Sequence, residues 1–261
     1  MSRAHDAITG HWPCLYPYAV SLLSSGVILS HSQLHGVLPH GQRVRPEDCR
    51  LQMIEALART MNARNAATYE HAERVRGYAL ALADALPSCD VHTADALDHA
   101  ALLHDVGKLA IPDGLLQKPG PLAPHEYDQV KHHVIIGADM LAAIAYPGPL
   151  ALIVRHHHEH WDGSGYPDGL IGDAIPLGAR ILAIADVYDA LTSDRPYRRA
   201  LSHAHAVDML QARAGVMYDP GIVEVFLPLV ERLNAQAHKV LTPRFPGLVR
   251  AGWLTEARAA G

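Results

Sequence analysis

The segment HHHEHWDGSGYP, residues 156–167, contains the residue types best suited to chemistry in this chain. Adjacent histidines that run into a turn rich in glycine and proline are hard to explain by packing alone. The dipeptide His104-Asp105 lies upstream, and Asp186 lies downstream inside ARILAIADVYDAL. Imidazoles and carboxylates are ligands for Zn, Mn and Fe, and ions held by several of each usually catalyse hydrolysis or redox chemistry. These three segments together indicate a metal centre.

Helices would have to position these side chains. Over most of the chain, apolar residues recur at the helical period, whereas strand-like alternation is scarce. His71 and His133 lie on the inward faces of two expected helices, and His104 and Asp105 end a third, apolar helix. Asp186 is flanked by apolar residues, where a carboxylate without a partner would be costly to bury. The sequence therefore predicts inward polar side chains that converge in one helical domain.

Composition places the chain among globular proteins. Its 261 residues are 49% hydrophobic and 19% charged, with a net charge of −5 and a pI near 6.4. That balance argues against a broad basic surface for polymeric nucleic acid. Three widely spaced cysteines imply no disulfide framework and fit a reducing cytoplasm. The apolar stretch 13–30 is too short and too polar for a membrane span, so we expect no membrane role.

The pattern of apolar and polar residues changes along the chain. Residues 1–48 contain short apolar runs with rough alternation, which indicates a small N-terminal appendage with one or two β-strands and no assignable role. Residues 50–237 form the expected helical domain, and residues 238–261 form a C-terminal extension. The expected fold class is all-α, a helical bundle with a small appendage.

From about residue 68 to residue 226 the chain closely resembles the HD-GYP domain, a branch of the HD superfamily of metal-dependent phosphohydrolases. The matching motifs are TYEHAERV, LLHDVGK, KPGPLAPHEYDQVKHHVIIG, HHEHWDGSGYPDGL and IPLGARILAIADVYDALTSDRPYRRA. The resemblance implies an HD-domain helical bundle. It also implies a phosphodiesterase that opens the bacterial second messenger cyclic di-GMP to linear pGpG and, in some members, on to GMP.

The resemblance further implies the metal ligands. Carried over position by position, they are His71, His104, Asp105, His133, His157, His158 and Asp186. One ion would take His71, His104, Asp105 and Asp186, and the other would take His133, His157, His158 and the second oxygen of a bridging Asp105. Four protein ligands on each ion leave room for water and substrate in an octahedral shell, which suits Fe or Mn better than tetrahedral Zn.

One departure from the family pattern affects the number of metals. Some family members hold a third metal with a Glu one helical turn before the first histidine, where this chain has Ala67. We therefore expect two divalent ions. Three neighbours of the ligands are expected in supporting or surface positions, namely His132, His156 and His160.

The resemblance also implies groups that act on substrate. Lys108 matches the family lysine that reaches the phosphate, and together with Asp105 it is the expected catalytic pair. Tyr166 lies in a glycine-rich loop beside the site. This loop would form a lip on the substrate side, a docking surface for signalling partners, or only a tight turn.

Two arginines of the DRPYR segment match family cationic residues that grip the substrate phosphates. Arg195 and Arg198 would bind phosphate through their guanidinium groups, which pair with phosphate in a bidentate manner. The structural alternative is a salt bridge at the helix end with Asp189 or Asp194.

Three functions are consistent with these motifs. The first is a phosphodiesterase for a cyclic dinucleotide. The second is a non-catalytic adaptor that contacts diguanylate cyclases of the GGDEF type, against which the presence of every family ligand argues. The third is another di-iron HD enzyme, against which the full Gly-Tyr-Pro signature argues. The sequence leaves open the native metal, the preferred cyclic dinucleotide, whether GMP is a final product, and whether the chain forms a homodimer.

Overall fold

The computed structural model describes residues 45–194 and 198–235. The predicted N-terminal strands, the predicted C-terminal extension and Arg195 lie outside these residues. The chain divides into two units, Met1–Met53 and Ile54–Gly261. The division falls inside helix α2 (Pro46–Arg64), so the first unit is described only by residues 45–53.

The described part of the second unit is helical. After α2 its elements are α3 (Ala66–Ala85), α4 (Val91–Leu103), η2 (Val106–Ala110), α5 (Asp113–Leu116), α6 (Pro124–Lys131), α7 (His133–Ala142), α8 (Leu150–His156), η3 (Gly172–Ala174), α9 (Leu177–Thr192), α10 (His203–Ala212) and α11 (Pro220–Ala235). These residues contain no β-strand and only isolated β-bridges, such as that between Asp162 and Ile171. The prediction of an all-α domain is confirmed.

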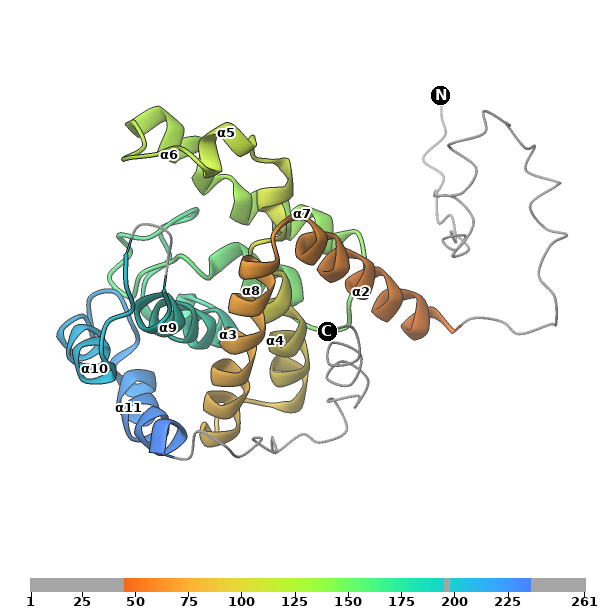
Figure 1. Cartoon of the computed structure of the whole chain (residues 1–261). Coiled ribbons are helices and arrows are strands. Elements are labelled where there is room, and N and C mark those ends of the chain that lie inside the picture. The colour runs from red at the N-terminus through yellow and green to blue at the C-terminus, as the bar shows by residue number, and fades with distance from the viewer. Residues whose placement is uncertain (1–44, 195–197, 236–261) are drawn as a thin grey trace, which may run out of the picture. The chain divides into compact units, whose positions relative to one another are not determined.

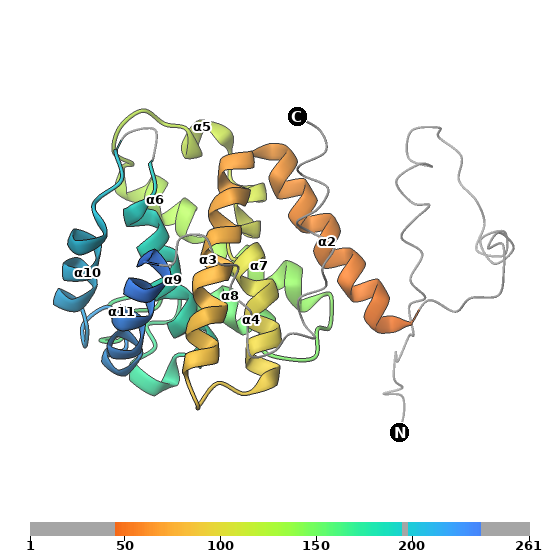
Figure 2. The same cartoon turned by 60° about the horizontal axis from the view of Figure 1, so that its bottom comes forward.

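Four helices form the core that carries the site. Helix α3 packs against α4 and α9, and α4 packs in turn against α8 and α9 (Figure 1). Figure 2 shows α3 and α4 running side by side. Their facing surfaces bury aliphatic side chains at the helical period, for example Leu97 of α4 and Ile181 and Leu182 of α9. Each such burial contributes roughly 1.5–3 kcal/mol to stability. The core therefore fixes the helix ends at which the polar side chains lie.

A close backbone contact at Gly107 brings two parts of the site together. A Cβ atom at this position would lie 1.9 Å from the carbonyl oxygen of His133, a distance that no side chain can occupy. Glycine therefore allows η2 to pack directly on the start of α7. As a result, the His104-Asp105 dipeptide lies next to His133.

None of the helices in residues 45–194 and 198–235 combines the length and the apolar character that a bilayer-spanning segment needs.

Candidate metal centre

Three histidines reach the site with one ring nitrogen bound to the backbone. In His104, His133 and His157, Nδ1 lies 2.9, 2.7 and 2.7 Å from the carbonyl oxygen three residues earlier. Because a carbonyl only accepts hydrogen bonds, Nδ1 carries the proton and Nε2 keeps its lone pair. This tautomer is the one that binds a metal through Nε2.

The first group of candidate ligands consists of His133, His157 and His158, and we call it the histidine cluster. The three residues each offer a nitrogen atom within 4.8 Å of the others. Nε2 of His133 and Nε2 of His157 are buried and have no hydrogen-bond partner among the described residues. An unpaired buried polar atom costs about 1–3 kcal/mol. The unpaired lone pairs therefore fit a metal ion that would satisfy them.

The protonation state of the histidine cluster also suits a metal. Burial lowers the pKa of His133, and it lowers the pKa of His157 well below the usual range. Burial lowers the pKa of His158 to about 4, with His133 acting in the same direction. All three imidazoles are therefore neutral near pH 7, the form in which histidine is a ligand.

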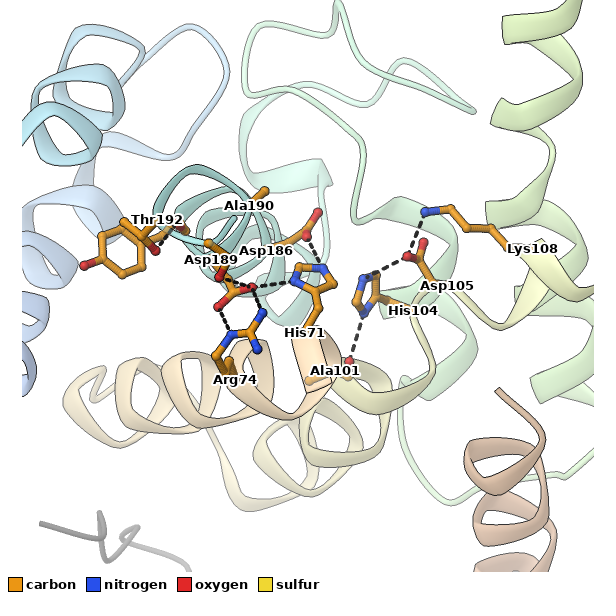
Figure 3. A network of polar contacts seen from close by, with 12 residues as sticks. His71, Arg74, Ala101, His104, Asp105, Lys108, Asp186, Asp189, Ala190 and Thr192 are labelled. Carbon is orange, nitrogen blue, oxygen red and sulfur yellow. Dashed lines mark hydrogen bonds and ion pairs between the residues drawn. The ribbon is translucent and has the colours of Figure 1, made fainter. Parts of the chain in front are cut away.

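The second group consists of His71, His104 and Asp186, and we call it the mixed cluster. Its ligand atoms also lie within 4.8 Å of one another. His71 lies between two carboxylates of α9, with Nε2 3.0 Å from Oδ1 of Asp186 and Nδ1 2.6 Å from Oδ2 of Asp189 (Figure 3). The Asp189 contact fixes the ring so that Nε2 faces Asp186 and the pocket.

Arg74 completes this arrangement from the same helix as His71. Its Nε donates to Oδ1 of Asp189 at 2.7 Å, and its Nη2 donates to Oδ2 at 3.0 Å (Figure 3). Burial lowers the pKa of His71, but the carboxylates of Asp186 and Asp189 outweigh burial and raise this pKa to about 9. Burial raises the pKa of Asp186, but His71 and His104 outweigh it and hold that pKa well below the usual range. Nε2 of His71 and Oδ1 of Asp186, which share a proton here, could instead bind the same metal cation.

Asp105 lies between the two clusters. Its Oδ2 is 3.6 Å from Nε2 of His104, and its Oδ1 is 3.5 Å from Nε2 of His133. Lys108 donates from Nζ to Oδ2 of Asp105 at 2.7 Å. Burial raises the pKa of Asp105, but the charge of Lys108 and the two histidines outweigh burial and hold the pKa well below the usual range. The carboxylate is therefore ionised, and each of its oxygens faces a different cluster.

A pocket of about 580 Å³ gives access to both clusters. We call it the main pocket. Its wall includes His71, Arg74, Asp105, Lys108, His157, His158 and Asp186. A ligand in the main pocket can therefore meet the mixed cluster, the histidine cluster and the lysine together. The structure brings all seven predicted ligands to one place, in the two groups that the resemblance implies.

Tyr166 lies against the histidine cluster. Its ring centroid is 5.0 Å from that of His158, and its backbone N–H donates to the carbonyl of His158 at 3.1 Å. A Cβ atom on Gly165 would lie 2.2 Å from the backbone nitrogen of His160, so the loop packs directly on the segment that carries two candidate ligands, His157 and His158. Tyr166 covers one face of His158 and is not on the wall of the main pocket.

Glu159 holds the loop in this position, and the sequence analysis did not single it out. The side chain is 3% exposed and accepts the backbone N–H groups of residues 168–170 at 2.7–3.1 Å. A carboxylate between ligand histidines and a glycine-rich loop was the signal that could have identified it. By fixing the loop, Glu159 keeps Tyr166 on His158.

A third group, made of His156, Glu159 and Asp168, also has the spacing of a metal site. Its atoms, however, have protein partners. Nε2 of His156 lies 2.9 Å from Oδ2 of Asp168, and Arg155 donates to both oxygens of Asp168 at 2.8 Å. We interpret this group as an anchor for the Gly-Tyr-Pro loop, which gives His156 the supporting position that was expected.

Arg198 is bound to the end of the helix that carries Asp186. Its guanidinium donates to the carbonyl of Leu191 at 3.1 Å and to that of Arg199 at 3.0 Å, and it also binds the carbonyl of Ala190. These contacts satisfy carbonyls at the C-terminal end of α9. Arg198 forms no ion pair within the described residues, so it makes neither of the alternative salt bridges, to Asp189 or to Asp194; Asp189 binds Arg74, and Asp194 accepts the backbone N–H of Ala200. Arg198 is also not on the wall of the main pocket.

Comparison with known proteins agrees with this geometry. A family model for the HD domain matches residues 55–222. The chain is 42% identical over 183 residues to the cyclic di-GMP phosphodiesterase response regulator RpfG of Xanthomonas campestris, covering 69% of this chain and 48% of that protein. It is 39% identical over 178 residues to the 3′3′-cGAMP-specific phosphodiesterase 2 of Vibrio cholerae, covering 67% of this chain and 34% of that protein.

The chain thus spans less than half the length of these two curated relatives. A solved structure of an HDG“Y”P protein from Bdellovibrio bacteriovorus superposes with a TM-score of 0.53 at 21% identity, over 72% of this chain and 65% of that one, and supports the fold alone. The resemblance drawn from the motifs is confirmed, and the chain belongs to the HD domain family.

Proposed function

We propose that this chain is a metal-dependent phosphodiesterase that hydrolyses cyclic di-GMP to linear pGpG. The observation that carries the proposal is the position of Asp105, whose two oxygens face two different groups of candidate metal ligands in one pocket. The names of the two curated relatives support a cyclic dinucleotide as the substrate class.

The site would hold two divalent ions, and Fe or Mn suits it best. The candidate ligands are imidazoles and carboxylates, without a thiolate, which is the donor set that these metals accept. When bound, the ions would supply an activated water near neutral pH and neutralise the charge on the phosphate.

The side chains around the two clusters would bind and orient the phosphate. Lys108 reaches the main pocket with a side chain that is 36% exposed, so its ammonium can meet a phosphate oxygen beside Asp105. Arg74 has Nε and Nη2 on Asp189, and its Nη1 has no partner among the described residues. Since Arg74 is on the same wall, Nη1 can donate to a second phosphate oxygen.

Other assignments stay predictions from the sequence. They are substrate binding by Arg195, Arg198 and Tyr166, contact with a diguanylate cyclase of the GGDEF type, a homodimer, and a cytoplasmic location. A second cleavage to GMP would need pGpG to bind again.

Metal analysis of anaerobically purified protein, combined with chromatography of the products from cyclic di-GMP and 3′3′-cGAMP, tests the proposal. We expect two Fe or Mn ions per chain and pGpG as the product of cyclic di-GMP. Asp105→Ala should lose both ions and the activity but keep its helical circular dichroism. Asp173→Ala is the control, because that side chain is 89% exposed and lies outside the main pocket.

Three outcomes would contradict the proposal. An Asp105→Ala variant that keeps two ions per chain and normal turnover would show that Asp105 does not bridge the ions. Oxygen uptake without phosphodiester cleavage would favour another di-iron enzyme. Metal-loaded protein that binds a diguanylate cyclase but cleaves no cyclic dinucleotide would favour the adaptor.

A further inference from the structure

Tyr218 lies on the wall of the main pocket, and the sequence analysis did not single it out. It shares that wall with Ala183 and Asp186 of α9. The residue is only 6% exposed, so most of its surface is packed against the protein. The small remaining surface is where Tyr218 can meet a ligand in the main pocket.

Two backbone hydrogen bonds join the segment before Tyr218 to the segment that follows the histidine cluster. The N–H of Trp161 donates to the carbonyl of Met217 at 3.1 Å, and the N–H of Asp162 donates to the carbonyl of Val216 at 2.9 Å. These bonds fix the backbone at Tyr218 relative to the candidate ligands that lie a few residues before Trp161.

The residue after Tyr218 is bound as well. Asp219 accepts the backbone N–H groups of Gly221 at 2.9 Å and Ile222 at 3.4 Å, and it pairs with Arg180 of α9 at 2.7 Å. Tyr218 is therefore held from both sides along the chain. A side chain that is held in place before a ligand arrives loses little conformational entropy on binding, which favours affinity.

The hydroxyl of Tyr218 has no hydrogen-bond partner among residues 45–194 and 198–235. It is nevertheless not closed off from solvent, in contrast to the unpaired Nε2 atoms of His133 and His157. Tyrosine hydroxyls on buried rings usually find a partner. This hydroxyl is therefore free to bind a ligand.

The environment of the hydroxyl makes it a hydrogen-bond donor. Burial is the largest cause that raises the pKa of Tyr218 to about 12, with Arg213 acting against it and Asp186 acting with it. The phenol therefore keeps its proton near neutral pH. Because the charge of Asp186 acts on it, the hydroxyl lies on the side of the pocket where the mixed cluster is.

Phosphate oxygens are the ligand atoms expected at that place. Under the proposed function, the ion bound by the mixed cluster would bind a phosphate of the substrate. The non-bridging oxygens of a phosphodiester carry negative charge and only accept hydrogen bonds, so they match an O–H donor. A hydrogen bond to a charged acceptor is about twice as strong as one between neutral groups.

We infer that Tyr218 is a substrate-binding residue whose hydroxyl donates to a phosphate oxygen at the mixed cluster. This inference rests on the proposed function and adds to it a donor that the motifs did not predict. Lys108 binds Asp105, between the two clusters, whereas Tyr218 shares the wall with Asp186. The two donors would therefore meet the phosphate from different parts of the pocket.

Tyr218→Phe tests the inference because it removes only the hydroxyl. Since this hydroxyl has no partner within the described protein, the melting temperature and the metal content should not fall. The KM for cyclic di-GMP and the Kd of inorganic phosphate for the metal-loaded protein should each rise about tenfold, the size of one hydrogen bond to a charged group. The value of kcat should change little, because the contact is made in the ground state and the transition state alike.

Tyr146→Phe is the matched control. The hydroxyl of Tyr146 binds Asp95 and lies outside the main pocket. Its removal should lower the melting temperature and leave the KM and the phosphate Kd unchanged, which is the opposite of the pattern expected for Tyr218→Phe.

Phosphate binding separates this inference from the proposed function, because it needs no turnover. An unchanged phosphate Kd in Tyr218→Phe overturns the inference and leaves the proposed function intact; the hydroxyl would then face the cavity of about 10 Å³ that Tyr218 shares with Arg180. A weaker phosphate affinity that is accompanied by loss of metal also overturns it, since the effect would come from the ions. Absence of turnover of every cyclic dinucleotide by the wild-type protein overturns the proposed function, whereas a tenfold weaker phosphate affinity with full metal content would still support the contact.

Discussion

His71 on α3 and Asp189 on α9 are joined by a 2.6 Å contact between Nδ1 and Oδ2 (Figure 3). Asp189 is 1% exposed, and Arg74 and the hydroxyl of Ser193 also donate to it. A carboxylate on the far nitrogen of a metal-binding histidine fixes the ring and increases the basicity of the other nitrogen. Asp189 is therefore a positioning residue for the mixed cluster.

Asp189→Asn should weaken metal binding at the mixed cluster by about 10–100-fold, because His71 loses a charged acceptor. The histidine cluster should keep its affinity, so metal titration should show one weakened site and one unchanged site. Asp173→Asn is the control, since this carboxylate is 89% exposed. A lower melting temperature with unchanged affinity at both sites would show that Asp189 only stabilises the fold.

The buried imidazoles should make the metal-free chain sensitive to acid. The pKa of His158 is about 4 in the folded chain, against 6.5 for an unperturbed histidine, mainly because of burial. Between these values the unfolded chain binds a proton that the folded chain does not, so stability falls as the pH falls from about 6.5 towards 4. The pKa values of His133 and His157 are lowered too, and they add to the effect.

His71 should act at the other end of the pH range. Burial alone would lower its pKa, but the two carboxylates raise it to about 9. Its contribution is complete below about 6.5 and is lost as the pH rises through 9. Melting temperatures of chelator-treated protein, measured from pH 4.5 to 9.5, should therefore peak near neutrality. A melting temperature that is constant below pH 6.5 would contradict the neutral state of the histidine cluster.

Arg198 and Arg195 should differ in their effect on stability. Arg198→Ala removes hydrogen bonds to three backbone carbonyls, two of them in the last turn of α9, and should cost about 1–2 kcal/mol of unfolding free energy. If Arg198 also contacts the substrate, the KM of the Arg198→Ala variant should rise as well. Arg195→Ala should raise KM with little change in melting temperature. An Arg198→Ala variant with lower stability and unchanged kinetics would limit this arginine to capping α9.

The helical fold could be predicted from the sequence because its signal is local, whereas the set of seven candidate ligands came from the resemblance to the HD-GYP domain. Apolar residues recur at the helical period, and the ligand types lie in short motifs. The roles of Asp189 and Glu159 were not predicted, because they depend on tertiary contacts. The partner of Asp189 lies 118 residues away along the chain, and Glu159 binds backbone groups, which have no signature in the side-chain sequence. The capping role of Arg198 was missed for the same reason.

Ala67 bears on the product of the reaction. It lies in the first turn of α3, one helical turn before His71, and is on the wall of the main pocket. A carboxylate at this position would face the pocket, but alanine has none, so the site is expected to hold two ions. Two ions suffice for one in-line attack on a phosphodiester. The first cleavage would leave pGpG, which must bind again with a new terminal phosphate before a second cleavage.

With no third cation to neutralise that added charge, the second cleavage should be the slower step, so pGpG should accumulate in time-resolved chromatography. Ala67→Glu should raise the metal content above two per chain and shorten the lag before GMP appears. The new carboxylate lies near a helix N-terminus, where a negative charge is stabilising, so the fold should tolerate it. Ala67→Gln is the matched control, because it adds the same bulk without the charge. It should leave the metal content and the lag before GMP unchanged. GMP as the main early product of the wild-type chain, without a pGpG phase, would refute the prediction, because the second cleavage would then need no group at position 67.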